Sequence, residues 1–253
     1  EILAYAERVV ERFGLRDGMT FNSRVLATHY LSEEERWQVQ LDSGEEIQAR
    51  FVVMATGCLS KPNYPNIDGL NQASVPVYHT ANWPHDGVDF TNMRVGVIGT
   101  GSSAIQSTPI IAEQAQSLTV FQRTPNYSIP AYNEPLDPDY VAQLKSRYAE
   151  YRQENWARGF GADFNDNDQS AFDVSDDERQ QAYEERWAKG GLAFLAAYND
   201  LVFDMHANDT ARAFFKSKIA ARVDDPSLTE KLVPSTPIGC KRLCVDTHYY
   251  EIY

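Results

Sequence analysis

The sequence predicts an α/β protein in which a dinucleotide-binding unit is followed by a long helical segment. Three observations indicate this fold class. A short apolar strand at residues 95–98 runs into the glycine turn Gly99 to Gly101, and a helix is expected over residues 102–115. A second apolar strand at residues 118–121 completes a βαβ pattern. After Pro125 the apolar residues recur with helical spacing.

The N-terminal part shows a change of periodicity. Residues 1–13 place apolar side chains at intervals of three and four, which predicts an amphipathic helix ended by Gly14. From Met19 to Phe51 the period becomes two, and a turn at residues 42–44 predicts a small antiparallel sheet. Residues 51–57 form an unbroken apolar stretch, so we expect a strand that is buried on both faces.

The later part is predicted to be largely helical. Residues 61–69 contain Pro62, Pro65 and Gly69 and are typical of a linker. We expect four helices, at residues 138–151, 176–189, 192–201 and 210–223. Residues 239–253 mix small, basic and aromatic side chains, and we expect them to return to the sheet.

Composition narrows the class of partner. With 23 basic and 36 acidic side chains the formal charge is −13, so a nucleic-acid backbone would be repelled and no nucleic-acid partner is expected. No run reaches the roughly 18 apolar residues of a membrane span, and no secretory leader is recognisable. We therefore expect a cytoplasmic protein with no membrane partner. The chain lacks an initial Met and stops within an apolar run, so a piece of a longer protein is expected.

The cysteines do not suggest a structural role. There are three, Cys58, Cys240 and Cys244, and the last two lack the spacing and second ligand pair of a zinc site. We interpret them as reduced thiols and expect no metal.

The glycine turn has the chemistry of a phosphate cradle. Glycines let backbone N–H groups approach a pyrophosphate closely, and the helix that follows offers the positive end of its dipole. The residues that we expect to bind the dinucleotide here are Gly99, Thr100, Gly101, Ser102 and Ser103. A glycine string alone is a weak signal, but the flanking strand, helix and second strand supply the context that the motif needs.

The end of the second strand indicates which dinucleotide is bound. An NAD site usually has Asp or Glu about 20 residues after the turn, to accept from the ribose 2′-hydroxyl. This sequence has Arg123 and Thr124 instead, which suit a 2′-phosphate through charge-assisted hydrogen bonds. NADP(H) is favoured over NAD(H), with an ordinary solvated arginine as the alternative interpretation.

A series of motifs gives the chain a family resemblance. His79, Trp83 and Pro84 form an HxxxWP string just before the fingerprint. It resembles the signature of Baeyer-Villiger monooxygenases, and the chain is similar to their cyclohexanone monooxygenase branch over nearly all 253 residues. The other matching stretches are 55–57, 66–70, 99–106, 122–125, 136–138 and 239–242. The family signature FxGxxxHxxxWP is incomplete, because Ala73 and Val75 replace its Phe and Gly.

The resemblance implies a flavoprotein fold with two dinucleotide-binding domains, of which this chain holds part. It implies a partial FAD-binding domain with the β excursion at 1–60, a linker and Rossmann-like NADP-binding unit at 61–135, a helical insertion at 136–236 and a return to the NADP domain at 237–253. The family's first glycine fingerprint is absent, so an isolated chain is expected to be nearly colourless.

The resemblance also implies an activity and a set of site residues. NADPH would reduce FAD, O₂ would give a flavin peroxide, and the peroxide would insert one oxygen beside the carbonyl of a cyclic ketone to yield an ester or lactone. Arg242 would be the catalytic residue, because its charge is permanent. Lys241 would join Arg123 and Thr124 at the 2′-phosphate. The residues implied in FAD binding are Val25, Ala55, Thr56 and Gly57.

Other functions stay open from the sequence alone. A flavin-dependent N- or S-oxygenating monooxygenase shares the two-site plan, and a non-catalytic NADP-binding fragment would retain the same turn. A disulfide reductase would need a CxxC or CxxxxC pair, which the sequence lacks.

Overall fold

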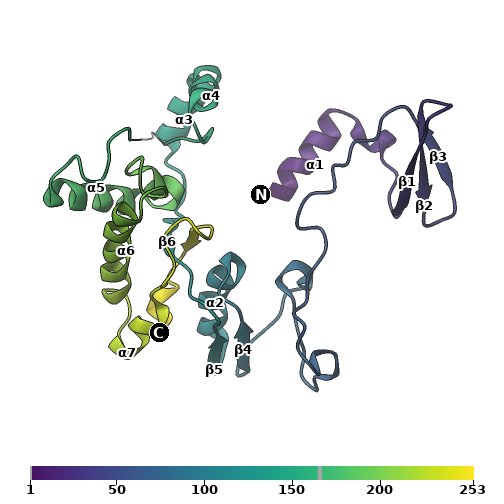
Figure 1. Cartoon of the computed structure of the whole chain (residues 1–253). Helices are drawn as coiled ribbons and strands as arrows, with labels where there is room; N and C mark the ends of the chain where they lie inside the picture. Colours follow the sequence, from purple (N-terminus) through teal and green to yellow (C-terminus); the bar gives the residue numbers. More distant parts are fainter. Residues whose placement is uncertain (1, 165–166) are drawn as a thin grey trace. The chain divides into compact units, whose positions relative to one another are not determined.

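The computed structural model describes residues 2–164 and 167–253. The chain divides into two compact units, Glu1–Pro65 and Asn66–Tyr253. Figure 1 labels the elements of both units along the chain. The finer division into four segments remains a prediction.

The first unit contains a helix and a small sheet. Helix α1 (Ile2–Arg12) is amphipathic as predicted, although none of its side chains is buried, and Gly14 follows it with a left-handed φ of 58°. A 3-10 turn at Leu15–Gly18 leads to the antiparallel sheet β1-β2-β3. Its strands are β1 (Val25–Leu31), β2 (Arg36–Leu41) and β3 (Glu46–Ala49). Tyr30 faces Trp37 across the first pair with ring centroids 5.3 Å apart, which confirms the predicted antiparallel excursion.

The apolar stretch after β3 is not the buried strand that we expected. In the described part of the chain residues 51–57 pair with no strand, and Phe51, Val53 and Met54 are 78%, 85% and 70% exposed. Ala55 N–H donates to Val53 O at 3.0 Å, a local bond that replaces a ladder. The prediction was wrong because a buried strand needs neighbours on both edges, and an apolar run cannot provide them by itself.

The second unit begins with irregular chain and then forms the βαβ arrangement. Short 3-10 turns at Leu70–Gln72 and Thr80–Asn82 precede β4 (Arg94–Ile98), α2 (Ser102–Gln114) and β5 (Ser117–Phe121). Strands β4 and β5 are parallel, with Arg94 opposite Ser117 and Ile98 opposite Phe121. Helix α2 contacts both strands (Figure 1). This confirms the predicted unit almost residue for residue.

The helical segment differs from the prediction in several boundaries. The helix expected over 138–151 is two helices, because Arg147 (φ −121°, ψ 25°) interrupts it. The helix expected over 192–201 is a 3-10 turn at Gly191–Ala196, and the one expected from residue 210 starts at Met205, where Asp204 caps it. Asp225 and Pro226 start an additional helix. The helices are α3 (Pro138–Ser146), α4 (Tyr148–Ala157), α5 (Asp176–Lys189), α6 (Met205–Ala220) and α7 (Pro226–Leu232).

The C-terminal stretch joins a different sheet from the one expected. Strand β7 (Cys244–Asp246) pairs in parallel with β6 (Ser128–Pro130), whereas β4 and β5 form their own two-stranded sheet in the described part of the chain. A last 3-10 turn spans Tyr250–Ile252. The partner of β7 is set by long-range packing, which a local residue pattern does not reveal.

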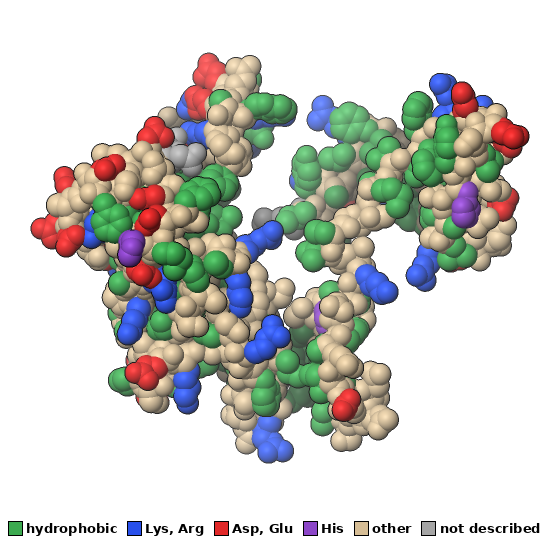
Figure 2. Space-filling view, in the orientation of Figure 1, with side chains coloured by type: hydrophobic (Ala, Val, Ile, Leu, Met, Phe, Trp, Pro, Cys, Tyr) green, Lys and Arg blue, Asp and Glu red, His purple; other side chains and the backbone are tan. Residues whose placement is uncertain are grey.

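Two buried clusters hold the second unit together. The larger contains the aromatic side chains of the helical segment, and Phe215 lies at its centre with ring centroids 4.8 Å from Phe194 and 5.3 Å from Trp187. The smaller brings Ile105 of α2 together with Ile219 of α6 and Tyr250. On the face drawn in Figure 2, acidic side chains gather over α5, whose buried residues Tyr183 and Trp187 belong to the larger cluster.

Candidate functional site

The glycine turn leaves the start of α2 open to a ligand. Gly99 has a φ of 107°, which favours glycine, and its N–H donates to Phe121 O at 2.9 Å. Gly101 is the N-cap residue, and no side chain caps the helix. The first N–H groups of α2, which begins at Ser102 and Ser103, therefore point toward the turn without a capping side chain. This is the geometry of an anion site at a helix N-terminus.

Two further hydrogen bonds tie the turn to the segment that follows β5. Thr100 is 6% exposed, and its hydroxyl donates to Thr124 O at 2.8 Å. The Asn126 side-chain amide donates to Thr100 O at 2.5 Å. Because Thr100 is held at both its hydroxyl and its carbonyl, the glycine turn and the segment that carries Arg123 form one continuous rim. Asn126 was missed in the sequence because an Asn after a strand has no distinctive pattern.

A pocket of about 530 Å³ lies against this rim. Arg123 and Thr124 line it beside the turn, and Lys241 reaches it from the far end of the helical segment. The side-chain oxygen of Asn126 is buried without a hydrogen-bond partner, and Asn126 also lines the pocket. The complete lining is Ile67, Ile98, Gly99, Thr100, Gly101, Phe121, Arg123, Thr124, Asn126 and Lys241.

The electrostatics of the pocket oppose those of the whole chain. The chain has a formal charge of −13, yet two cations and no carboxylate line this pocket. Among the residues that the structure describes, neither Arg123 nor Lys241 makes an ion pair. Their charges are therefore available to an anionic ligand.

Arg242 does not share this pocket. It is exposed and follows Lys241 directly, and its carbonyl accepts a long contact from the Cys244 thiol at 3.8 Å. In the described ranges of the chain its guanidinium makes no ion pair. The structure thus brings six of the eight residues predicted for NADP binding to one pocket. Ser102 and Ser103, which begin α2, are not in the pocket lining, and neither is Arg242.

The HxxxWP string shapes the chain before β4. His79 is half-buried, and its Nδ1 accepts from Ala81 N–H at 3.1 Å, which caps the 3-10 turn Thr80–Asn82. The Trp83 ring lies between Tyr78 and Phe90, with centroids 5.9 and 6.1 Å away. Pro84 O accepts from Gly87 N–H at 3.0 Å. These contacts give the motif a structural role in this segment.

The residues implied in FAD binding lie in the first unit. Val25 is the first residue of β1 and is 50% exposed. Ala55, Thr56 and Gly57 follow the exposed apolar stretch, and Gly57 has a φ of 69°. They therefore offer accessible backbone groups, as a cofactor held mainly through backbone contacts needs.

Two further observations concern the whole chain. Cys58, Cys240 and Cys244 are free thiols, and only Cys244 is buried. Within residues 2–164 and 167–253, no helix combines the length and apolar character that crossing a membrane requires.

Comparison with known proteins places this chain in a family. A family model described as pyridine nucleotide-disulphide oxidoreductase matches residues 1–185. Cyclohexanone 1,2-monooxygenase of Acinetobacter sp. is 37% identical over 257 aligned residues, which cover 100% of this chain and 47% of that protein. The 2-oxo-Δ³-4,5,5-trimethylcyclopentenylacetyl-CoA monooxygenase of Pseudomonas putida is 36% identical, over 100% and 48%. The chain spans about half the length of the curated relatives it matches.

Solved structures agree with these relatives. A structure described as oxidized steroid monooxygenase bound to NADP is 52% identical with a TM-score of 0.95, covering 100% of this chain and 48% of that one. An open cyclohexanone monooxygenase structure is 37% identical with a TM-score of 0.94, covering 100% and 49%. The chain belongs to the pyridine nucleotide-disulphide oxidoreductase family, and its resemblance to Baeyer-Villiger monooxygenases of the cyclohexanone monooxygenase type is confirmed.

Proposed function

We propose that this chain supplies the NADP(H) site and the catalytic arginine of an FAD-dependent Baeyer-Villiger monooxygenase. The observation that carries the proposal is the pocket at the glycine turn beside the start of α2. Two cations that make no ion pair within the described residues line this pocket, and none of its lining residues is a carboxylate. The relative bound to NADP supports the same assignment.

The residues present fit a dinucleotide with a 2′-phosphate. Gly99 to Ser103 would hold the pyrophosphate through backbone N–H groups, because the left-handed Gly99 and the free helix start leave them accessible. Arg123, Thr124 and Lys241 would hold the 2′-phosphate, since guanidinium, hydroxyl and ammonium groups all donate. The orphaned oxygen of Asn126 would accept from a ribose hydroxyl or amide.

The residues of this chain would form only part of an FAD site. Val25, Ala55, Thr56 and Gly57 fit one side of it, because their backbone is exposed and Gly57 permits close approach. The chemistry that FAD would supply when bound is acceptance of a hydride from NADPH and activation of O₂. The substrate would be a ketone, as the names of the relatives indicate for those proteins.

Arg242 would act by electrostatics. Adding an oxygen nucleophile to a ketone leaves negative charge on the former carbonyl oxygen, and a fixed positive charge beside that oxygen stabilises the transition state. A guanidinium stays charged at every working pH and offers several donors in a plane. Arg242 is suited to this role because it is exposed and unpaired in the described residues, while its neighbour Lys241 faces the coenzyme pocket.

A redox disulfide has no part in this proposal. The three cysteines are free, and Cys244 is buried while Cys240 is exposed. Reduced thiols are typical of the cytoplasm, where we propose that the protein works.

The test is coenzyme selectivity. Arg123→Ala should weaken NADP⁺ by about 1 to 3 kcal/mol, the range for a hydrogen bond to a charged group, because one phosphate ligand is lost. NAD⁺ has no 2′-phosphate, so its dissociation constant should hardly change. Isothermal titration of the 253-residue chain with both coenzymes measures the difference.

Arg94→Ala is the matched control. Arg94 is exposed and begins β4, at the opposite end of the strand from the turn. The Arg94→Ala substitution removes the same charge and should alter the affinity for neither NADP⁺ nor NAD⁺. Equal losses of NADP⁺ and NAD⁺ in Arg123→Ala would show that Arg123 does not contact the 2′-phosphate.

A further inference from the structure

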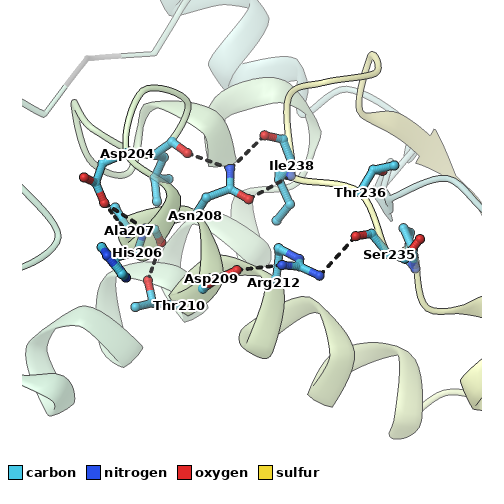
Figure 3. Close-up of polar contacts among 12 residues, drawn as sticks. Asp204, His206, Ala207, Asn208, Asp209, Thr210, Arg212, Ser235, Thr236 and Ile238 are labelled. Atoms are coloured by element: carbon cyan, nitrogen blue, oxygen red, sulfur yellow. Dashed lines mark hydrogen bonds and ion pairs between the residues drawn. The ribbon is translucent and has the colours of Figure 1, made fainter.

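The segment that leads to Lys241 is irregular but tightly held. Residues 233–243 contain no helix or strand, and yet side chains of α6 and of Tyr127 make hydrogen bonds to the backbone of four of their residues. Tyr127 donates its hydroxyl to Thr236 O at 2.8 Å and to Pro234 O at 3.2 Å. Arg212 of α6 donates to Ser235 O at 3.2 Å (Figure 3). Lys241 and Arg242, near the end of this segment, are its two residues with proposed roles in binding and catalysis.

Asn208 makes the most specific of these contacts. It lies in the first turn of α6, which the Asp204 carboxylate caps, and its side chain is 3% exposed. Its amide nitrogen donates to Ile238 O at 2.9 Å and to Leu201 O at 2.7 Å, and its oxygen accepts from Ile238 N–H at 3.0 Å. Figure 3 shows this amide facing Ile238 from the helix.

One amide therefore satisfies both backbone groups of one residue. The two hydrogen bonds fix the orientation of the peptide groups on either side of Ile238, as pairing with a strand would. Because the contact is buried, rotating these peptide groups would leave polar atoms without partners. We call this pair of hydrogen bonds between the Asn208 amide and Ile238 the clamp. Because Asn208 belongs to α6, the clamp fixes the position of Ile238 relative to that helix.

Gly239 then sets the direction of the chain. It has a φ of 93°, and a Cβ there would lie 2.9 Å from Val202 Cγ1, so the backbone passes against the segment before α6. Two residues later Lys241 lines the coenzyme pocket, with Arg242 next to it. The hydrogen bonds at Ile238 and the backbone conformation of Gly239 therefore set the path of the chain that leads to Lys241 and Arg242.

We propose that Asn208 is a positioning residue for Lys241 and Arg242. It touches neither coenzyme nor substrate and acts by holding Ile238, from which both cations follow at a fixed short distance along the chain. This inference rests on the proposed assignment of Lys241 to the 2′-phosphate. A side chain that served stability alone would weaken the fold without changing which coenzyme is preferred.

The experiment is a double-mutant cycle on the 253-residue chain with NADP⁺ and NAD⁺ as probes. Asn208→Asp keeps the shape and the accepted bond but loses both donated bonds. It should weaken NADP⁺ by about tenfold and leave NAD⁺ within about twofold, in the range of coupling energies for connected residues. In a Lys241→Ala background the same change should have little effect on NADP⁺, because the positioned group is gone.

A spectroscopic readout reports the loop directly. Cys240 is exposed beside Lys241 and Cys244 is buried, so a Cys58→Ser chain can be spin-labelled at Cys240 alone. Asn208→Asp should narrow the label's spectrum, which indicates greater local mobility. Asn167→Asp is the matched control, since Asn167 donates to Ala197 O at 2.8 Å and, among the described residues, makes no hydrogen bond to residues 233–243. It should change neither the spectrum nor the coenzyme preference.

The outcomes separate the two proposals. If Lys241→Ala leaves the preference for NADP⁺ unchanged, the proposed role of Lys241 fails. If Lys241→Ala abolishes the preference but Asn208→Asp weakens both coenzymes equally, or leaves the label unchanged, the positioning role is wrong. Should Asn208→Asp not fold, Gly239→Ala displaces the same loop from its other side, and it must lower NADP⁺ affinity selectively for the proposal to stand.

Discussion

Single residues decide the electrostatics of this site, and they come from segments far apart in the chain. Arg123 follows β5, whereas Lys241 and Arg242 follow the whole helical segment. Lys241 lines the pocket at the glycine turn and Arg242 does not, and we propose different roles for these neighbouring positions. Two adjacent cations can therefore be tested for separate functions, one in binding and one in reaction.

Replacing Arg242 should affect the reaction and spare the coenzyme. In an enzyme of full family length that carries this chain, Arg242→Ala should lower ester or lactone formation by about 10² to 10³, the typical effect of removing one preorganised stabiliser of developing charge. The dissociation constant of NADP⁺ should change little, because Arg123, Lys241 and the glycine turn remain. Product formation from a cyclic ketone at saturating NADPH measures the loss.

Arg242→Lys distinguishes charge from geometry. Lysine retains the charge but not the planar set of donors, so partial recovery is expected. Lys241→Ala is the companion variant, which should raise the KM for NADPH more than it lowers kcat. An Arg242→Ala enzyme that forms product at the original rate would contradict the catalytic role.

At the scale of elements, local chemistry sets where several helices begin. Helix α5 starts with a capping box, in which Glu178 N–H donates to the Ser175 hydroxyl at 3.3 Å and Ser175 N–H donates to the Glu178 carboxylate at 2.9 Å. The backbone and side-chain hydrogen bonds from Ser175 lower the pKa of Glu178 below its ordinary value. The helix predicted over 176–189 is confirmed, and the capping box explains why it begins at Asp176.

The capping box predicts a pH-dependent contribution to stability. Because the folded pKa of Glu178 is depressed, its contribution is present above the unfolded pKa and is lost as pH falls through the folded pKa. Glu178→Gln keeps an acceptor oxygen but cannot titrate. The wild-type chain should therefore be the more stable of the two at about pH 7, and this advantage should shrink toward about pH 3.

Urea unfolding of both chains at the two pH values measures the effect. Glu185→Gln is the control, because this substitution removes the same charge from α5 at a position outside the first turn. A difference between wild type and Glu178→Gln that is independent of pH would mean that the carboxylate does not strengthen the cap.

At the scale of the second unit, one buried cluster links the coenzyme site to the helical segment. Ile105 of α2 and Ile219 of α6 are both fully buried in it, together with Tyr250. Helix α2, whose N-cap residue Gly101 lines the pocket, therefore shares its core with α6, which contributes no residue to the pocket lining. Ligand binding should stabilise both.

Hydrogen exchange can test this link. NADP⁺ at about 100 times its dissociation constant stabilises the folded state by roughly 2.7 kcal/mol, so the most protected amides of α6 should exchange up to about 100-fold more slowly. Amides of α4, a helix with no buried residue, should not respond. Slowing that is confined to residues 94–126 would show that the shared cluster does not couple the two parts.

The sequence by itself determined the elements whose signals are local. Gly99 and Gly101 between two apolar strands, the box of Ser175 and Glu178, and Arg123 in place of an acidic residue all act through near neighbours. Tertiary structure decided the remainder. The apolar run at 51–57 is not a strand because strand formation depends on partners, and β7 pairs with β6 through contacts between distant segments. Asn126 and Asn208 became visible only in three dimensions, since an amide gains its role from the backbone groups that folding places around it.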